Sequence, residues 1–168
     1  AHREENIDIE RNFFSLMSAV NALAKKYDMP ILYSCHPRSE KYIKARDFKF
    51  DHRVIQHKPL GFLDYNKLQL NAFCVVSDSG TLPEESACLG FPAVSVRTST
   101  ERPEAMDKGV FIIGSIAAEH VIQAVDMAVR IKPSRFNVPA YSDKNVSDTV
   151  VKIIQSYTPI INTMVWRK

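Results

Sequence analysis

The stretch of residues 73–90 constrains the fold of this chain more than any other. It opens with an apolar run, 73–76, that predicts a buried strand. The polar cluster at 77–80 follows directly and predicts a turn. A helix is then expected from Thr81 to a glycine C-cap at Gly90. The sequence therefore predicts a strand, a tight turn and a helix in immediate succession.

The start of this helix suits a phosphate group. Thr81 and Glu84 have the spacing of a capping box, and Pro83 fits the first turn because its missing N–H costs nothing there. Free backbone N–H groups and the positive end of the helix dipole would point toward one spot. We therefore expect Ser79, Gly80 and Thr81 to bind phosphate. The alternative is an ordinary strand-to-helix turn with a serine cap.

Helices and strands alternate along the rest of the chain. Apolar spacing predicts helices over 7–26, 38–46, 62–72, 117–130 and 146–157, strands over 31–33, 54–55, 92–96 and 110–113, loops over 57–61 and 132–141, and a polar loop or helix start over 97–104. This order predicts an α/β fold, a Rossmann-like doubly wound parallel sheet.

Aromatic and aliphatic side chains give the expected core. The predicted core phenylalanines are Phe13, Phe14, Phe62, Phe73 and Phe91. In the helix over 62–72, Leu63, Leu68 and Leu70 are expected to pack inward.

Length and composition exclude several classes of protein. A chain of 168 residues with 45% hydrophobic and 24% charged residues is typical of one globular domain. A net charge of +3, without a dense basic stripe, disfavours a nucleic-acid partner. Neither an apolar run long enough to span a membrane nor a secretory signal is visible, so no membrane association is expected. The first residue is not methionine, and the chain resembles a piece cut from a longer polypeptide.

The three cysteines, Cys35, Cys74 and Cys88, lie in apolar segments without metal-binding spacing. We interpret them as buried free thiols in a reducing compartment, which indicates the cytoplasm. No metal site is expected, and nothing suggests a bound cofactor.

Polar clusters follow several predicted strands. They occupy residues 34–38, 77–81 and 97–102, and the loop over 54–61 adds His57 and Lys58. Because the carboxyl ends of parallel strands meet at one edge of a sheet, these clusters should converge. Histidine, arginine, serine and glycine together at such an edge are typical of a nucleotide or phosphate pocket.

With these motifs in place, the chain resembles the C-terminal half of the non-hydrolysing UDP-N-acetylglucosamine 2-epimerases, a family built like the two-domain GT-B glycosyltransferases. The matching motifs are HREEN at 2–6, HP at 36–37, DSG followed by EE at 78–85, LGFP at 89–92 and TERPEA at 100–105. Thr81 and Pro83 stand where many members carry Gly and Gln, and an Asp often found before the TERPE loop is replaced around Thr98. These variants look like the branch that forms UDP-N-acetyl-L-fucosamine from a UDP-linked 2-acetamido-2,6-dideoxy-L-hexose; UDP-N-acetylglucosamine stays open as the substrate.

The resemblance implies roles for residues at the nucleotide. Ser79 and Gly80 would contact the diphosphate, and Glu85 would accept the ribose hydroxyls, which a carboxylate can do with two oxygens. His2 and Arg3 would face the phosphates, with His2 as the catalytic contact to the leaving phosphate. A frayed terminus is the alternative for His2 and Arg3.

Further residues match the family at the cleft. The position of His36 helps some bacterial members to bind a second, regulatory UDP-sugar, and a purely structural histidine is the alternative. Arg102 resembles the cleft arginine of the family, with Glu101 and Glu104 as residues that orient it or cap a helix. We interpret Glu84 as a capping residue. Possible rim charges are Arg97, Lys58 and His57.

The resemblance also implies a mechanism and partners. The family removes the C2 proton and expels UDP to give a 2-acetamidoglycal, then adds UDP and a proton back on the other face. The carboxylates that move the proton come from the other domain, which is absent from these residues, so the isolated chain is expected to be inactive. A homodimer is implied, with residues 145–168 crossing toward the missing domain. The donor half of a GT-B glycosyltransferase and a non-catalytic UDP-sugar binding module are the alternatives.

Overall fold

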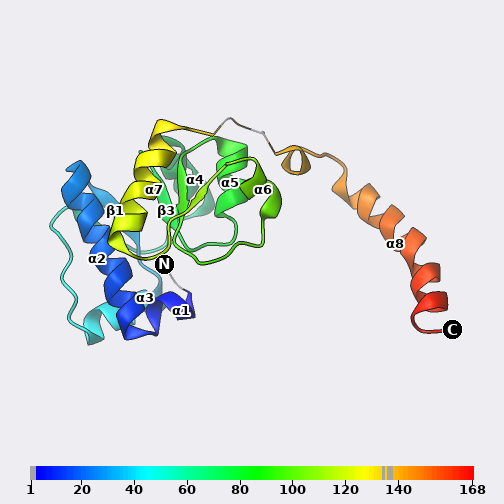
Figure 1. Ribbon diagram of the computed structural model, residues 1–168, viewed down its shortest axis with the longest axis horizontal. Helices are drawn as coiled ribbons and strands as arrows, with labels where there is room; N and C mark the ends of the chain where they lie inside the picture. The colour runs from blue at the N-terminus through cyan, green and yellow to red at the C-terminus, as the bar shows by residue number, and fades with distance from the viewer. Residues whose placement is uncertain (1–2, 134, 136–137) are drawn as a thin grey trace. The chain divides into compact units, whose positions relative to one another are not determined.

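The computed structural model describes residues 3–133, 135 and 138–168. The chain divides into two compact units, Ala1–Val138 and Pro139–Lys168. The first unit contains all the strands that the structure describes, and the second is a short helical segment (Figure 1).

The strands of the first unit are all parallel. β1 (Ile31–Ser34) pairs with β2 (Val54–His57), and the other three lie in the order β3 (Val75–Ser77), β4 (Ala93–Ser95) and β5 (Ile112–Ile113). Parallel strands that alternate with helices confirm the predicted α/β fold class. Within the described residues the strands form two hydrogen-bonded sheets, because neither β1 nor β3 has a second neighbouring strand there.

The helices lie between the strands, close to the predicted ranges. The first unit contains α1 (Glu4–Ile7), α2 (Glu10–Tyr27), α3 (Pro37–Ala45), α4 (Phe62–Asn71), α5 (Leu82–Leu89), α6 (Pro103–Asp107) and α7 (Ala118–Arg130). The second unit contains a 3-10 turn (Pro139–Tyr141) and α8 (Val146–Met164). The last helix is longer than the predicted 146–157.

The predicted helix over 7–26 is wrong at its start, because two separate helices, α1 and α2, cover this range and the helix is interrupted between them. The carbonyl oxygens of Ile7 and Asp8 accept hydrogen bonds from the Arg46 guanidinium at 2.8 Å each, instead of helical N–H groups. Asp8 also accepts two hydrogen bonds from Arg38. The Arg38 guanidinium accordingly lowers the pKa of the Asp8 carboxyl. These side-chain contacts end α1 and fix it to α3.

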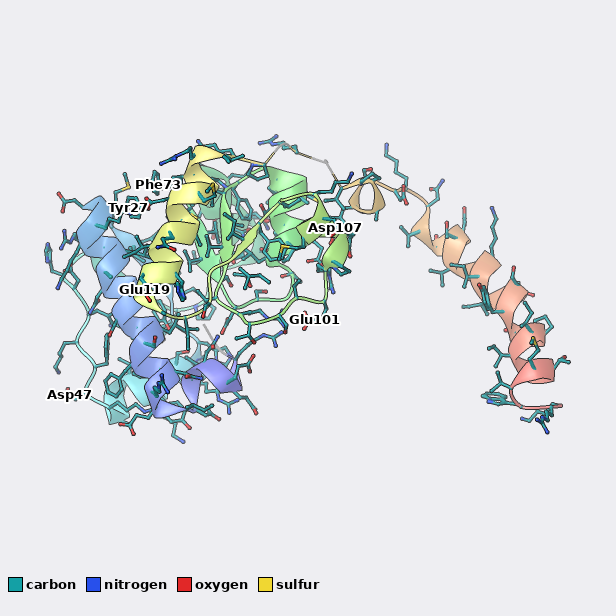
Figure 2. The ribbon with its side chains drawn as sticks, viewed as in Figure 1. Tyr27, Asp47, Phe73, Glu101, Asp107 and Glu119 are labelled. Atoms are coloured by element: carbon teal, nitrogen blue, oxygen red, sulfur yellow. The ribbon has the colours of Figure 1, made fainter. Side chains whose placement is uncertain are left out.

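The core lies between the sheets and the pair α2 and α7, which run beside each other (Figure 1). Phe13 of α2 is fully buried, and Phe91 is 2% exposed. Tyr27 at the end of α2 donates a hydrogen bond to Asp126 of α7 at 2.6 Å. Figure 2 shows Phe73 beside Tyr27, with ring centroids 5.1 Å apart.

The predicted core was wrong for several residues. Phe62 is 79% exposed, and Phe14 and Phe73 also lie at the surface. In α4 the predicted inward leucines Leu63, Leu68 and Leu70 are exposed as well, while Gln69 is buried. Helical spacing identifies an apolar face, but the face is buried only where another element covers it.

The cysteines are free thiols, and of the three only Cys35 is buried; Cys74 and Cys88 are partly exposed. The apolar surroundings of the partly buried Cys74 thiol raise its pKa to about 12. None of the helices in the described part of the chain is long and apolar enough to cross a membrane.

Candidate functional site

A chain of side-chain hydrogen bonds surrounds the start of α5. The hydroxyl groups of Ser79 and Thr81 lie 3.0 Å apart, and the Thr81 hydroxyl donates to Glu85 Oε1 at 2.7 Å. The Thr81 backbone N–H also reaches Ser79 Oγ at 3.3 Å. The structure therefore brings these three predicted site residues together at one helix N-terminus.

The predicted capping box is wrong. Thr81 precedes the first residue of α5, but its side chain makes no capping hydrogen bond. Its backbone is α-helical, with φ −88° and ψ −5°, whereas a capping residue is normally extended. The Thr81 hydroxyl consequently points along the helix to Glu85. Glu84, predicted as the capping partner, contacts Arg102 instead.

Gly80 borders open space at the turn before α5. A Cβ atom placed on Gly80 would meet no other atom within 4 Å, and its φ is not in the left-handed region. Neither the packing nor the backbone conformation of this chain therefore requires glycine here. By contrast Gly90, at the other end of α5, is left-handed with φ 76°, as the predicted C-cap requires.

Arg3, directly before α1, and Asn6, within α1, are fixed to residues that follow two of the strands. The Arg3 backbone N–H donates to Asp78 Oδ2 at 2.9 Å, and Arg3 Nε donates to the Asp78 carbonyl oxygen at 3.0 Å. The buried Asn6 side chain donates to the Val96 carbonyl oxygen at 3.0 Å. Arg3 is thus held in place rather than frayed, whereas His2 lies outside the described residues.

The loop between β4 and α6 adds two arginines with separate partners. Arg97, predicted as a possible rim charge, is only 6% exposed and donates two hydrogen bonds to Glu101. The Arg97 guanidinium lowers the pKa of Glu101 to about 2, with a smaller contribution from Arg3. Glu101, the partner of Arg97, is labelled on this loop in Figure 2. Arg102 instead binds Glu84 of α5. Arg3 and Arg102 therefore contact the segments on either side of the start of α5, whereas Arg97 is held within its own loop.

His36 lies at a different place, after β1 of the other sheet. Its Nδ1 accepts a hydrogen bond from the Arg38 backbone N–H at 3.2 Å, so His36 caps α3. At the end of the neighbouring strand β2, His57 Nδ1 lies 2.7 Å from the Lys58 carbonyl oxygen. The hydrogen bonds that link Ser79, Thr81 and Glu85 do not include His36.

Three residues that support this cluster had no role among the sequence-based predictions. Asp78 and Asn6 belong to recognised motifs but had no predicted role, although both are buried: Asp78 binds Arg3, and Asn6 fixes α1 to Val96. Gln69 donates a hydrogen bond from Nε2 to Glu85 Oε2 at 2.5 Å. No sequence pattern pointed to Gln69, because it is a polar residue between apolar ones that are the expected core positions.

An apolar cavity of the first unit lies away from this cluster. It measures about 260 Å³, with a lining that includes Ala93, Ile112 and Met127. Ala93 and Ile112 are the first residues of β4 and β5, so the cavity is at the opposite edge of the sheet from Ser79. Within the described residues no group of His, Cys, Asp and Glu side chains could hold a metal ion.

Comparisons with known proteins point to one family. A family model described as UDP-N-acetylglucosamine 2-epimerase matches residues 1–155. A curated relative named UDP-N-acetylglucosamine 2-epimerase, from Methanococcus maripaludis, is 30% identical over 157 residues, which are 91% of this chain and 42% of the relative. The chain thus spans less than half the length of this relative.

Solved structures give the same result. The structure of UDP-N-acetylglucosamine 2-epimerase from Rickettsia bellii is 34% identical to this chain, with a TM-score of 0.79. The match covers 99% of this chain and 45% of the Rickettsia chain. The crystal structure of Methanocaldococcus jannaschii UDP-GlcNAc 2-epimerase in complex with UDP-GlcNAc and UDP is 28% identical, with a TM-score of 0.81. Here the match covers 92% of this chain and 43% of the Methanocaldococcus chain. These structural neighbours are of the GT-B type.

Proposed function

The chain belongs to the UDP-N-acetylglucosamine 2-epimerase family, and from that premise we propose that it is the nucleotide-binding half of a UDP-sugar C2 epimerase. The observation that carries the proposal is the hydrogen-bonded series of Ser79, Thr81 and Glu85 at the start of α5. In this proposal Ser79, Gly80 and Thr81 bind the diphosphate, and Glu85 accepts the ribose hydroxyls. Two features support these roles: the positive end of a helix favours anions, and a Cβ atom added to Gly80 would have no protein atom within 4 Å.

The proposed chemistry is the elimination and re-addition of UDP. Loss of the C2 proton and of UDP gives a 2-acetamidoglycal, and UDP and a proton then return on the other face of the sugar. As UDP leaves, negative charge grows on its β-phosphate, and donors already in place would stabilise that charge by about 3 kcal/mol each. Arg3, held by Asp78, and Arg102, held by Glu84, are the arginines that we assign to this task. His2 is proposed to contact the leaving phosphate.

The groups that move the C2 proton are proposed to lie on the other half of the enzyme. A weakly acidic C–H needs a positioned base on one face of the ring and an acid on the other. We assign both to the domain that the relatives carry in the remaining part of their length, since this chain covers 42% of the Methanococcus relative. The isolated chain should therefore lack epimerase activity.

We further propose that residues 145–168 pack against that other half. None of the residues of α8 is buried, and its exposed apolar residues include Val150, Ile154, Tyr157 and Ile161. These four recur at helical spacing and form one face. A homodimer is also proposed, from the resemblance of the chain to the family. His36 is proposed to contribute to a second UDP-sugar site.

For the substrate we propose UDP-N-acetylglucosamine or a UDP-linked 2-acetamido-2,6-dideoxy-L-hexose, used in precursor synthesis for capsule or O-antigen. The decisive experiment incubates the polypeptide that carries both halves with each UDP-sugar in deuterated water. An epimerase incorporates deuterium at C2 of its substrate. Absence of deuterium with every UDP-sugar would contradict the proposal and favour a GT-B glycosyltransferase or a binding module.

The nucleotide site can be tested on the 168-residue chain alone. Titration with UDP, followed by calorimetry or by amide chemical shifts, should show weak binding that is lost in Glu85→Ala and in Ser79→Ala. The two variants remove different parts of the proposed site, so equal affinity for UDP in both and in the unmodified chain would refute it.

A further inference from the structure

Gln69 is an unusual residue to bury. Of the ten residues of α4, all of which the structure describes, only Gln69 is buried, at 2% exposure. Leu68 and Leu70 on either side of it are exposed. Because a leucine gains more than an amide from leaving water, apolar packing alone does not account for this arrangement.

The contact that Gln69 makes gives a physical reason for its burial. Its Nε2 donates to Glu85 Oε2 at 2.5 Å, and hydrogen bonds to a carboxylate are stronger than those between neutral groups. Its own Oε1 is buried and makes no hydrogen bond of good geometry, and Tyr65 of the same helix also interacts with the Gln69 side chain. A buried amide that leaves one atom unpaired is costly, so the gain lies in what the other atom does to Glu85.

Both oxygens of Glu85 are oriented by this chain. Thr81 donates to Oε1 at 2.7 Å from the partly open side, and Gln69 donates to Oε2 from the buried side. Two donors on different oxygens fix the plane of the carboxylate. A carboxylate has about four acceptor positions, so each oxygen keeps one for an incoming hydroxyl group.

We propose that Gln69 is a positioning residue that holds Glu85 for the two ribose hydroxyls of the nucleotide. This inference rests on the proposed function, because it assumes that Glu85 binds the ribose. Its consequence is discrimination between sugars: the chain binds a ribonucleotide more tightly than the 2′-deoxyribonucleotide, and Gln69 is required for that preference.

The test compares UDP with 2′-deoxy-UDP in titrations of the isotope-labelled chain followed by amide chemical shifts. Gln69→Met removes the hydrogen bond and keeps the approximate volume. We expect it to weaken UDP binding by about tenfold, the cost of ordering a free Glu85 side chain at the ribose on binding, and to weaken 2′-deoxy-UDP binding less. Gln123→Met makes the same exchange at an exposed position of α7 and should change neither Kd.

The outcomes separate this inference from the proposed function. If Glu85→Ala abolishes the preference for UDP and Gln69→Met leaves it intact, the role of Gln69 is refuted and the ribose role of Glu85 stands. If Glu85→Ala also leaves the preference intact, or if the unmodified chain has no preference, both are refuted. Loss of the preference in Glu85→Ala and Gln69→Met supports both.

A second variant gives a readout that a purely structural role would not produce. Gln69→Glu places a carboxylate beside Glu85, and two carboxylates at this distance share a proton once the pH falls. The shared proton restores a donor to Glu85. The UDP affinity of Gln69→Glu relative to that of the unmodified chain should therefore rise as the pH is lowered from about 8 to about 5, through the range where such coupled carboxyl groups titrate. A ratio that does not change with pH would overturn the proposal, even if Gln69→Met fails to fold.

Discussion

Arg3 and Asp78 are 75 residues apart in the sequence and share two hydrogen bonds. The Asp78 carboxylate accepts the Arg3 backbone N–H at 2.9 Å, and the Asp78 carbonyl oxygen accepts Arg3 Nε at 3.0 Å. One residue at the end of β3 therefore fixes both the backbone and the side chain of Arg3. Because Asp78 directly precedes Ser79, the same residue sets the distance from Arg3 to the proposed phosphate site.

Replacing Asp78 should release the segment before α1. Asp78 is 1% exposed, so Asp78→Ala leaves the Arg3 N–H without its acceptor and should lower the free energy of unfolding by about 1–3 kcal/mol. Hydrogen exchange should become faster at the amides of residues 3–7. Glu5→Ala removes the more distant ion pair with Arg3, 3.6 Å long and exposed, and should cost less than about 1 kcal/mol in chemical denaturation. Equal effects of the two variants would argue against the role of Asp78.

Two glycines allow a matched test of the open space at the phosphate site. A Cβ atom at Gly80 or at Gly61 would meet nothing within 4 Å, and neither residue has a positive φ. Gly80→Ala and Gly61→Ala should therefore leave the melting temperature nearly unchanged or raise it slightly. Only Gly80→Ala should weaken UDP binding, because its methyl group occupies space assigned to the diphosphate. Unchanged UDP affinity in Gly80→Ala would contradict that assignment.

Two phenylalanines test the corrected core. Phe13 is fully buried, and Phe13→Ala should cost about 3–5 kcal/mol of unfolding free energy because it leaves a cavity. Phe62 is 79% exposed, and Phe62→Ala should change the same quantity by no more than about 0.5 kcal/mol. Urea denaturation of the two variants measures both values. A large cost for Phe62→Ala would restore the prediction made from the sequence.

Acid should weaken the ion pair between Arg97 and Glu101. The pKa of Glu101 is about 2 in the folded chain, below its ordinary value of 4.5. Because the folded pKa is the lower one, the pair stabilises the fold above about pH 4.5, and this contribution is lost as the pH falls toward 2. The stability advantage of the unmodified chain over Glu101→Gln should shrink across this range in thermal unfolding. Glu119→Gln, at an exposed residue of α7, controls for the loss of a surface carboxylate.

Local patterns predicted much of the fold because they depend on neighbours in the sequence. The polar turn and the glycine at 90 correctly indicated the start of α5 and its left-handed end, and the apolar run at 73–76 indicated β3, although β3 begins at Val75 and is only partly buried. The helix predicted over 117–130 matches α7, Ala118–Arg130. The motifs also identified the family, since they occur in its order along nearly the whole chain.

The sequence by itself thus determined the α/β class, the place of the turn before α5 and the family. Only the tertiary structure decided which faces are buried, and that α1 ends where the Arg46 guanidinium donates hydrogen bonds to backbone carbonyl oxygens. It also decided that Glu84 pairs with Arg102, while Gln69 donates a hydrogen bond to Glu85. The reason is physical. A turn or a helix end is set by hydrogen bonds within a few residues, whereas burial and the choice of charge partner depend on whatever distant segment the fold brings opposite.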